Sequence, residues 1–108
     1  MPCAPAAYAL LVRIVSLVPS LTELVSWFGL ADSLVGRTRF CIEPPELAGR
    51  VPVMGGTKNP RIERIIDARP ALVLANREEN RREDVEALRE AGLAVLVTDP
   101  GTVPEAVA

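Results

Sequence analysis

The segment VMGGTKNPRIERI, residues 53–65, contains the residue types best suited to holding a ligand. Gly55 and Gly56 permit positive φ angles and a close approach of the backbone to a bound group. Lys58 and the free amides of a following helix could accept an anion. The alternative is an ordinary turn in which Asn59 caps that helix. No phosphate-loop or dinucleotide fingerprint is present, so the segment predicts a ligand-binding turn or a plain turn rather than a nucleotide cradle.

The run NREENRRED, residues 76–84, places four carboxylates among three arginines. Such runs are typical of a solvated helix start, because paired carboxylates that perform acid and base chemistry need a shielded pocket. Asn76 and Arg77 directly follow a buried apolar strand. We therefore expect these two residues to contact a ligand at the end of that strand.

Cys41 lacks the partners of a thiolate nucleophile, since the chain has no histidine and its other cysteine, Cys3, is distant in sequence. A structural thiol is favoured, and no catalytic residue and no metal ligand is assigned. Phe40 could line a cleft for a flat apolar ligand or pack inward. Trp27 and Tyr8 are interpreted as packing residues.

Composition limits the classes of function. The 108 residues are 49% hydrophobic and 24% charged with a net charge of −2, which indicates one globular domain and no attraction to nucleic acid. No stretch reaches the roughly 20 apolar residues of a membrane span. The first residues, MPCAPAAYALLV, carry no lysine or arginine, so an intact signal peptide is not expected.

These residues must be positioned by alternating strands and helices. Strands are predicted at 13–18, 34–36, 71–75 and 94–98, with a long irregular loop at 37–50. A first helix should begin at Ser20, which stands at capping-box spacing from Glu23, and end at Gly29. Its predicted buried stripe consists of Leu21, Leu24, Val25 and Phe28.

Two further helices follow the same logic. One is predicted over 60–68, with Asn59 as its cap and an inward face of Ile62, Ile65 and Ile66. The other starts after Asn80, ends at Gly92 and has an inward face of Val85, Leu88 and Ala91. Strand and helix units joined by short links predict an α/β fold with a mostly parallel sheet. The carboxyl ends of its strands should form one ligand-binding rim.

The ordered series of motifs resembles a known family. It consists of RIVSLVPSLTELVSWFGLADSLVG, the C-x-x-P-P-E element in FCIEPPE, VPVMGGTKNPRIERIIDARPALVLA and ALREAGLAVLVTDP. It looks like the N-terminal lobe of the periplasmic binding proteins that capture cobalamin, iron siderophores and haem for ABC importers. GGTKNP and NREEN resemble the helical-backbone metal receptor subgroup. The resemblance covers nearly all of the chain after about residue 12.

The resemblance implies a protein with two Rossmann-like, three-layer lobes joined by a long helix, with the ligand held between their rims. Residues 1–12 would be an extension, 13–101 the N-terminal lobe, and 102–108 the start of a helix toward the missing half. The family resemblance also implies that Glu63 docks onto arginines of the ABC permease. Its alternative is an exposed carboxylate stabilised by the helix dipole.

Ligand contacts transfer only in part. Phe40 matches a cleft aromatic of the cobalamin binders, whereas Thr57 and Asn76 occupy positions where those proteins carry aromatic residues. Two ligands are therefore considered, a cobalamin-like chelate and a smaller or more polar one such as a ferric siderophore. The predicted ligand-binding set is Phe40, Gly55, Gly56, Thr57, Lys58, Asn59, Asn76 and Arg77.

We interpret the chain as a non-enzymatic, substrate-binding lobe with no covalently bound cofactor. Its predicted partners are a metal chelate, an ABC permease and, through exposed apolar side chains such as Phe40, Ile42, Val103 and Val107, a second copy of itself. The resemblance implies a periplasmic or cell-surface location, with the cytoplasm as the alternative. Two other functions stay open: a stand-alone interaction or regulatory domain, and a small phosphate- or nucleotide-binding enzyme domain.

Overall fold

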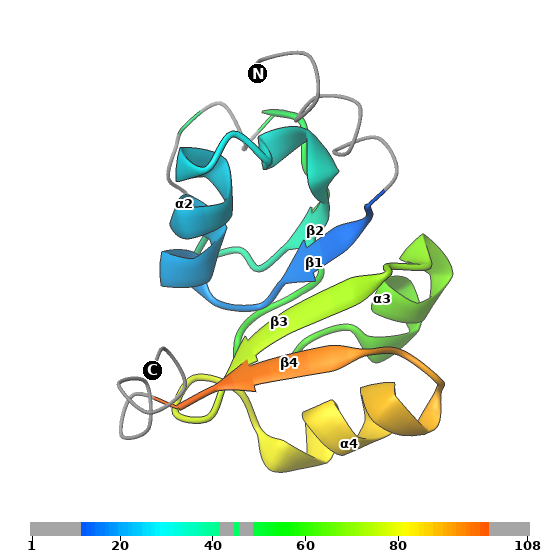
Figure 1. The fold of residues 1–108 in the computed structure, drawn as a ribbon. Helices are drawn as coiled ribbons and strands as arrows, with labels where there is room; N and C mark the ends of the chain where they lie inside the picture. The colour runs from blue at the N-terminus through cyan, green and yellow to red at the C-terminus, as the bar shows by residue number, and fades with distance from the viewer. Residues whose placement is uncertain (1–11, 42–44, 46–48, 100–108) are drawn as a thin grey trace.

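A computed structural model describes residues 12–41, 45 and 49–99 of the chain. Four parallel strands form one sheet in the order β2-β1-β3-β4 (Figure 1). Their bounds are β1 Ile14–Ser16, β2 Leu34–Arg37, β3 Leu72–Asn76 and β4 Val95–Thr98. The predicted α/β class and parallel sheet are confirmed. The strand predicted at 13–18 is shorter than expected, because Leu17 and Val18 already belong to the turn that leads into the first helix.

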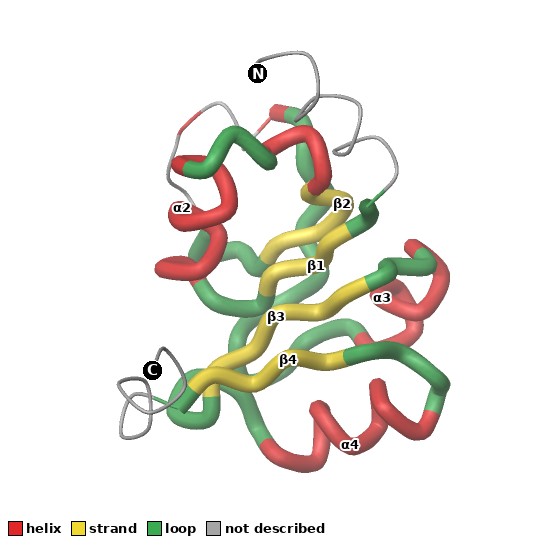
Figure 2. The backbone as a smooth tube through the Cα atoms, viewed as in Figure 1, coloured by secondary structure: helices red, strands yellow, loops and turns green. Residues whose placement is uncertain are grey.

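Helices cover the two faces of the sheet separately (Figure 2). Helix α2, Pro19–Trp27, and the short 3₁₀ helix η1, Ala31–Ser33, pack with the buried residues Ile14, Leu34, Val51 and Leu74. Helices α3, Ile62–Ala68, and α4, Arg82–Glu90, pack on the other face with Val15, Leu17, Met54, Ile65, Val73 and Leu88. Neighbouring residues of one strand thus point to opposite faces. The result is the expected three-layer arrangement.

Helix α2 differs from its prediction in start and in rotation. It begins at Pro19 after Val18, and Ser20 is exposed and makes no capping hydrogen bond. Leu21 and Val25 of the predicted stripe pack against the core, whereas Leu24 and Phe28 are 48% and 62% exposed, and Thr22 is the fully buried residue of the helix. The hydroxyl of Thr22 bonds to Ser16 Oγ at 2.8 Å and to Cys41 Sγ at 3.0 Å, which turns this side of the helix inward.

Trp27 is not a packing residue of the core, which corrects the interpretation from sequence. Its side chain is 81% exposed and meets the ring of Phe28 edge-on, with 5.6 Å between the ring centroids. The rotation that buries Thr22 also carries both aromatic rings to the outer side of α2. The outer surface of this helix therefore exposes apolar side chains beside Ser20 and Glu23.

The predicted caps of the other two helices are also wrong. The capping residues are Arg61 for α3 and Arg81 for α4, and neither uses its side chain. Pro60 lies before α3, because the Arg61 amide donates to Met54 O at 2.7 Å and closes the preceding turn first. Val85 and Leu88 are buried as predicted, whereas Ala91 is exposed beyond the end of α4.

Gly29 and Gly92 follow α2 and α4 with φ angles of 79° and 93°, as their predicted role in ending these helices requires. No helix within the described part of the chain has the length and apolar content to cross a bilayer. Some of the predictions concern residues that the structure does not describe. These are Cys3, Tyr8, Ile42, Val103, Val107 and the segments 1–11 and 102–108.

Candidate functional site

The carboxyl ends of β1 and β3 meet at the point where the order of the strands reverses. The chain passes from β1 to β2 on one side and then returns to β3 on the other side of β1. In open parallel sheets this reversal leaves a crevice at which ligands bind. The segments that surround it are residues 17–19, 37–41, 55–59, 76–80 and 98–99. We call these segments the rim.

Asn80 joins three segments of the rim. Its side-chain amide donates to Leu17 O and to Thr57 O, both at 3.1 Å, and its Oδ1 accepts the Asn76 amide at 2.8 Å. The residue is only 4% exposed. Because a buried amide must be satisfied, these bonds fix the positions of the three segments relative to one another. Sequence reasoning missed this role, since the spacing from Asn80 to Glu83 is also that of a helix cap.

The glycine turn, residues 55–59, folds back on itself. Gly55 has a φ of 100°, and a β-carbon there would stand 2.8 Å from Asn59 O. At Gly56 a β-carbon would collide with Asn59 Oδ1, which belongs to an exposed side chain. The Gly56 amide closes the turn by donating to Asn59 O at 3.4 Å. The shape of the turn itself therefore requires glycine at position 55.

The other polar residues of the turn face the loop after β3. Lys58 Nζ donates to Glu78 O at 2.7 Å, so its ammonium group bridges the two segments. Thr57 is half-buried and supplies the carbonyl that Asn80 holds, whereas Asn59 is exposed. The structure thus brings Thr57, Lys58 and Asn76 into one neighbourhood.

Asn76 and Arg77 are both engaged within the chain. Asn76 Nδ2 donates to Thr98 Oγ1 at 3.1 Å, and its Oδ1 accepts the amides of Glu78 and Glu79. Arg77 forms an ion pair of 2.7 Å with Asp99 while its side chain stays 74% exposed. Arg77 therefore keeps donors that face solvent, and the amide of Asn76 chiefly shapes the loop. A hollow of about 340 Å³ lies beside them, lined by Asn76, Arg77, Asn80, Arg82, Val85, Arg89 and Val97.

Phe40 stands 54% exposed on the loop after β2. Cys41 anchors this loop: its buried sulfur lies 3.0 Å from Thr22 Oγ1 and 3.2 Å from Thr38 Oγ1. The environment agrees with the structural thiol predicted from the sequence. A thiol enclosed by two hydroxyl groups holds the loop against α2 and leaves the Phe40 ring free at the rim.

Arg37 is a second anchor of this loop that sequence reasoning did not identify. The residue is 6% exposed, its Nε donates to Val51 O at 2.9 Å, and its Nη1 donates to Cys41 O at 3.3 Å. Sequence offered no signal for it, because an arginine at the start of a long polar loop is expected to be solvated. Its guanidinium instead links the loop after β2 to the segment before the glycine turn.

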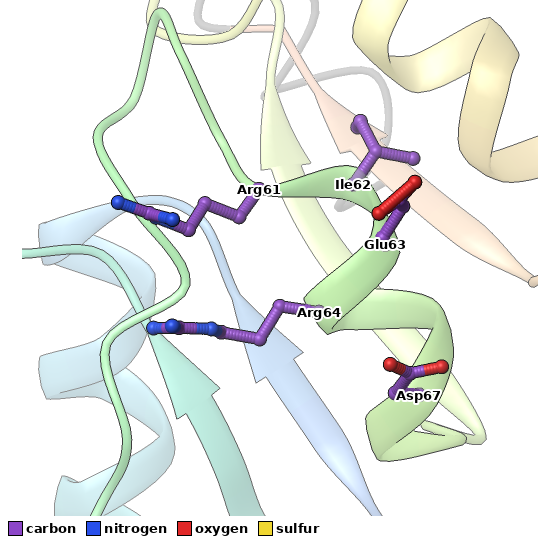
Figure 3. A pocket seen from close by; sticks show the side chains of 5 residues that line it. All are labelled: Arg61, Ile62, Glu63, Arg64 and Asp67. Atoms are coloured by element: carbon purple, nitrogen blue, oxygen red, sulfur yellow. The ribbon is translucent and has the colours of Figure 1, made fainter.

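Glu63 lies apart from these contacts, in the first turn of α3. It is exposed as predicted and borders a hollow of about 450 Å³ together with Arg61, Ile62, Arg64 and Asp67 (Figure 3). In Figure 3 the arginines at 61 and 64 extend in the same direction, while Glu63 and Asp67 stand away from both guanidinium groups. No ion pair involves Glu63 within the described part of the chain. Its carboxylate is available to a partner.

Among titratable groups, Asp84 in the first turn of α4 is perturbed. Burial raises the pKa of this carboxyl, the positive charge of Arg81 lowers it, and neighbouring Glu83 raises it further. Asp84 Oδ2 stands 3.6 Å from Arg81 Nε, too far for a hydrogen bond. The described residues contain no group of three or more histidine, cysteine or acidic residues able to hold a metal ion.

The known proteins similar to this chain are named as binding proteins for vitamin B12 or heme. The vitamin B12-binding proteins of Photorhabdus laumondii and Pectobacterium carotovorum are 34% and 31% identical over 98 and 100 residues. These matches cover 91% and 93% of this chain but only 35% and 36% of the relatives. The chain therefore spans about a third of the length of these curated relatives, which are named as binding proteins rather than enzymes.

The solved structures that resemble this chain are also binding proteins, and the chain again covers about a third of each. The periplasmic heme-binding protein RhuT of Roseiflexus sp. RS-1 in apo form superposes with a TM-score of 0.76 at 28% identity, over 82% of this chain and 34% of that one. The periplasmic vitamin B12 binding protein BtuF of Vibrio cholerae gives a TM-score of 0.72 at 29% identity, over 79% and 33%. No family model matches the chain.

Proposed function

Since the chain is similar in sequence and in fold to part of the periplasmic binding proteins for vitamin B12 and haem, we propose that it is the N-terminal lobe of such a protein. It holds one side of a metal chelate at the rim and delivers that chelate to an ABC importer. The lobe binds its ligand and catalyses no reaction. Its site of action is the periplasm or the cell surface.

The rim geometry carries the proposal. Asn80 holds the glycine turn, the end of β1 and the loop after β3 together at the reversal of strand order, where open α/β sheets bind ligands. The Arg39 amide donates to Gly55 O at 2.9 Å and brings the loop that bears Phe40 to the same turn. An aromatic ring, hydroxyl and amide groups and cationic side chains thus border one edge of the sheet.

This set of groups suits a chelate with a flat apolar body and a polar edge. The exposed ring of Phe40 offers a face for stacking. Thr57, Lys58, Asn59 and Arg77 supply polar contacts around it, with the two glycines giving the backbone of the turn its shape. A cobalamin-like chelate has this character, whereas a smaller or more polar ferric siderophore would rely on the polar contacts alone. The rim of a second lobe would enclose the other side of either ligand.

Contact with the permease is assigned to Glu63. Its carboxylate is exposed on α3, borders an open hollow and has no ionic partner among the described residues. Such a group can form a charge-assisted pair with an arginine of a docking protein.

A titration of the ¹⁵N-labelled chain with cyanocobalamin, ferric siderophores and iron protoporphyrin, followed by NMR, tests the function. We expect weak binding, because one rim buries only part of a ligand that two lobes would enclose, and drug-sized ligands are usually about 70–90% buried. Amides shifted by cyanocobalamin, or broadened by the paramagnetic iron chelates, should cluster at 55–59 and 76–80, while those of η1 stay unchanged. If no rim amide responds at millimolar ligand, the proposed function is wrong. If the affinity is submicromolar, the argument that this chain supplies only one side of the binding site is wrong.

A second copy of the chain is a further proposed partner. The outer side of α2 exposes Leu24, Trp27 and Phe28, and apolar surface of this kind favours association. Light scattering over a concentration series should show a dimer. A monomeric mass at high protein concentration would contradict it.

A further inference from the structure

Arg39 is a cationic residue of the rim that neither the motifs nor the relatives' names assign. Its backbone is fixed to the glycine turn by the bond to Gly55 O. Its guanidinium carbon lies over Gly56, 3.7 Å from the point where a β-carbon of that residue would stand. The side chain is exposed and forms no hydrogen bond or ion pair within the part of the chain that the structure describes. The five donors of this guanidinium therefore lie near the turn with no partner among the described residues.

Positively charged side chains border this part of the rim. Lys58, on the same turn, bonds to a backbone carbonyl and to no carboxylate. Arg77, by contrast, is paired with Asp99 at 2.7 Å. Two positive charges, on Arg39 and Lys58, therefore border the glycine turn. Among the described residues, neither forms an ion pair with a carboxylate. Such a field favours an anion over a neutral polar group.

We propose that Arg39, assisted by Lys58, binds the anionic edge of the ligand, and that the preferred chelate carries free carboxylates rather than amides. A guanidinium pairs with a carboxylate through two parallel hydrogen bonds, whereas an amide oxygen accepts without the charge. Phe40, the next residue of the loop, faces the apolar body of the same ligand. The inference rests on the proposed function and makes Arg39 the residue that distinguishes acidic from amidated chelates.

The test uses two cobalt(III) corrins that differ only at the ring edge, one with peripheral carboxylic acids and one with peripheral primary amides. NMR titrations give the dissociation constants for the 108-residue chain, for Arg39→Gln and for Arg50→Gln. The control makes the same charge change at the opposite end of β2, where Arg50 forms an exposed pair with Asp32. Amide spectra of both variants verify that the fold is retained.

We expect the acidic corrin to bind about threefold more tightly than the amide, which is the size of effect that one exposed ion pair provides. Arg39→Gln should abolish this preference, and Arg50→Gln should keep it. Equal binding of the two corrins by the unaltered chain, or a preference that survives in Arg39→Gln, overturns the inference and leaves the proposed function intact. Failure of both corrins and of the chelates named above to shift any rim amide overturns the proposed function itself.

Discussion

Replacing Asn80 by alanine should destabilise the protein strongly. The substitution removes three hydrogen bonds of 2.8–3.1 Å at a residue that is 4% exposed. Each such bond contributes about 1 kcal/mol, and the carbonyls of Leu17 and Thr57 and the amide of Asn76 lose a partner. We expect the free energy of unfolding to fall by about 3 kcal/mol. For a domain of this size that is a large part of a total of about 5–15 kcal/mol.

Urea denaturation at pH 7, followed by far-UV circular dichroism, measures the loss. The midpoint should fall while the slope stays unchanged, because the substitution leaves the surface exposed on unfolding nearly the same. The melting temperature should drop by roughly 10–20 °C. Asn59→Ala is the matched control: this asparagine lies on the same rim, is exposed and makes no side-chain hydrogen bond among the described residues. Its effect should stay within about 0.5 kcal/mol.

A loss below about 1 kcal/mol for Asn80→Ala would refute the reasoning. It would mean that water replaces the amide at all three positions, and that Asn80 does not hold the rim together. A loss of similar size in Asn59→Ala would point instead to a general sensitivity of the rim to truncation. Only a large difference between the two variants supports the assigned role.

Three further predictions concern single positions. Gly55→Ala should lower the free energy of unfolding, measured by urea denaturation, by about 1–3 kcal/mol, because its φ is 100° and backbone atoms crowd the new β-carbon. Gly56→Ala should cost less, because the exposed side chain of Asn59 can rotate away. Equal costs would contradict this account of the turn. Burial raises the pKa of Asp84 above its ordinary value of 3.8, so its contribution to stability is present below that pH and lost as pH rises through the raised pKa. Asp84→Asn should therefore raise the melting temperature at pH 7 and lose this advantage below about pH 4; a gain independent of pH would exclude titration as the cause. Glu63→Ala should change stability by less than about 0.5 kcal/mol and weaken binding to the importer's permease in a pull-down. A large fall in melting temperature with binding unchanged would show a structural role instead.

Alternation of apolar strands and amphipathic helices was enough to predict the fold class and the parallel sheet. The runs RIVSLV, ALVLA and AVLVT mark three strands, and each is followed by a turn and a polar segment. This pattern is local, so it indicates the class, the parallel sheet and the rim at the ends of the strands before any contact is known. The exposure of Glu63 and the ends of two helices at Gly29 and Gly92 follow from similarly local rules.

Tertiary contacts decided what local patterns leave open. Asn80 fits a helix cap by spacing, but Leu17, 63 residues away, supplies a carbonyl that draws its amide into the rim. The rotation of α2 buries Thr22, whose hydroxyl bonds to Cys41, 19 residues away, and it exposes Leu24 and Phe28 despite their helical spacing. The partner of a polar side chain is chosen by the nearest unsatisfied group in space, and sequence spacing gives that distance only within an element. For the same reason, only the structure could place Arg39 over the glycine turn.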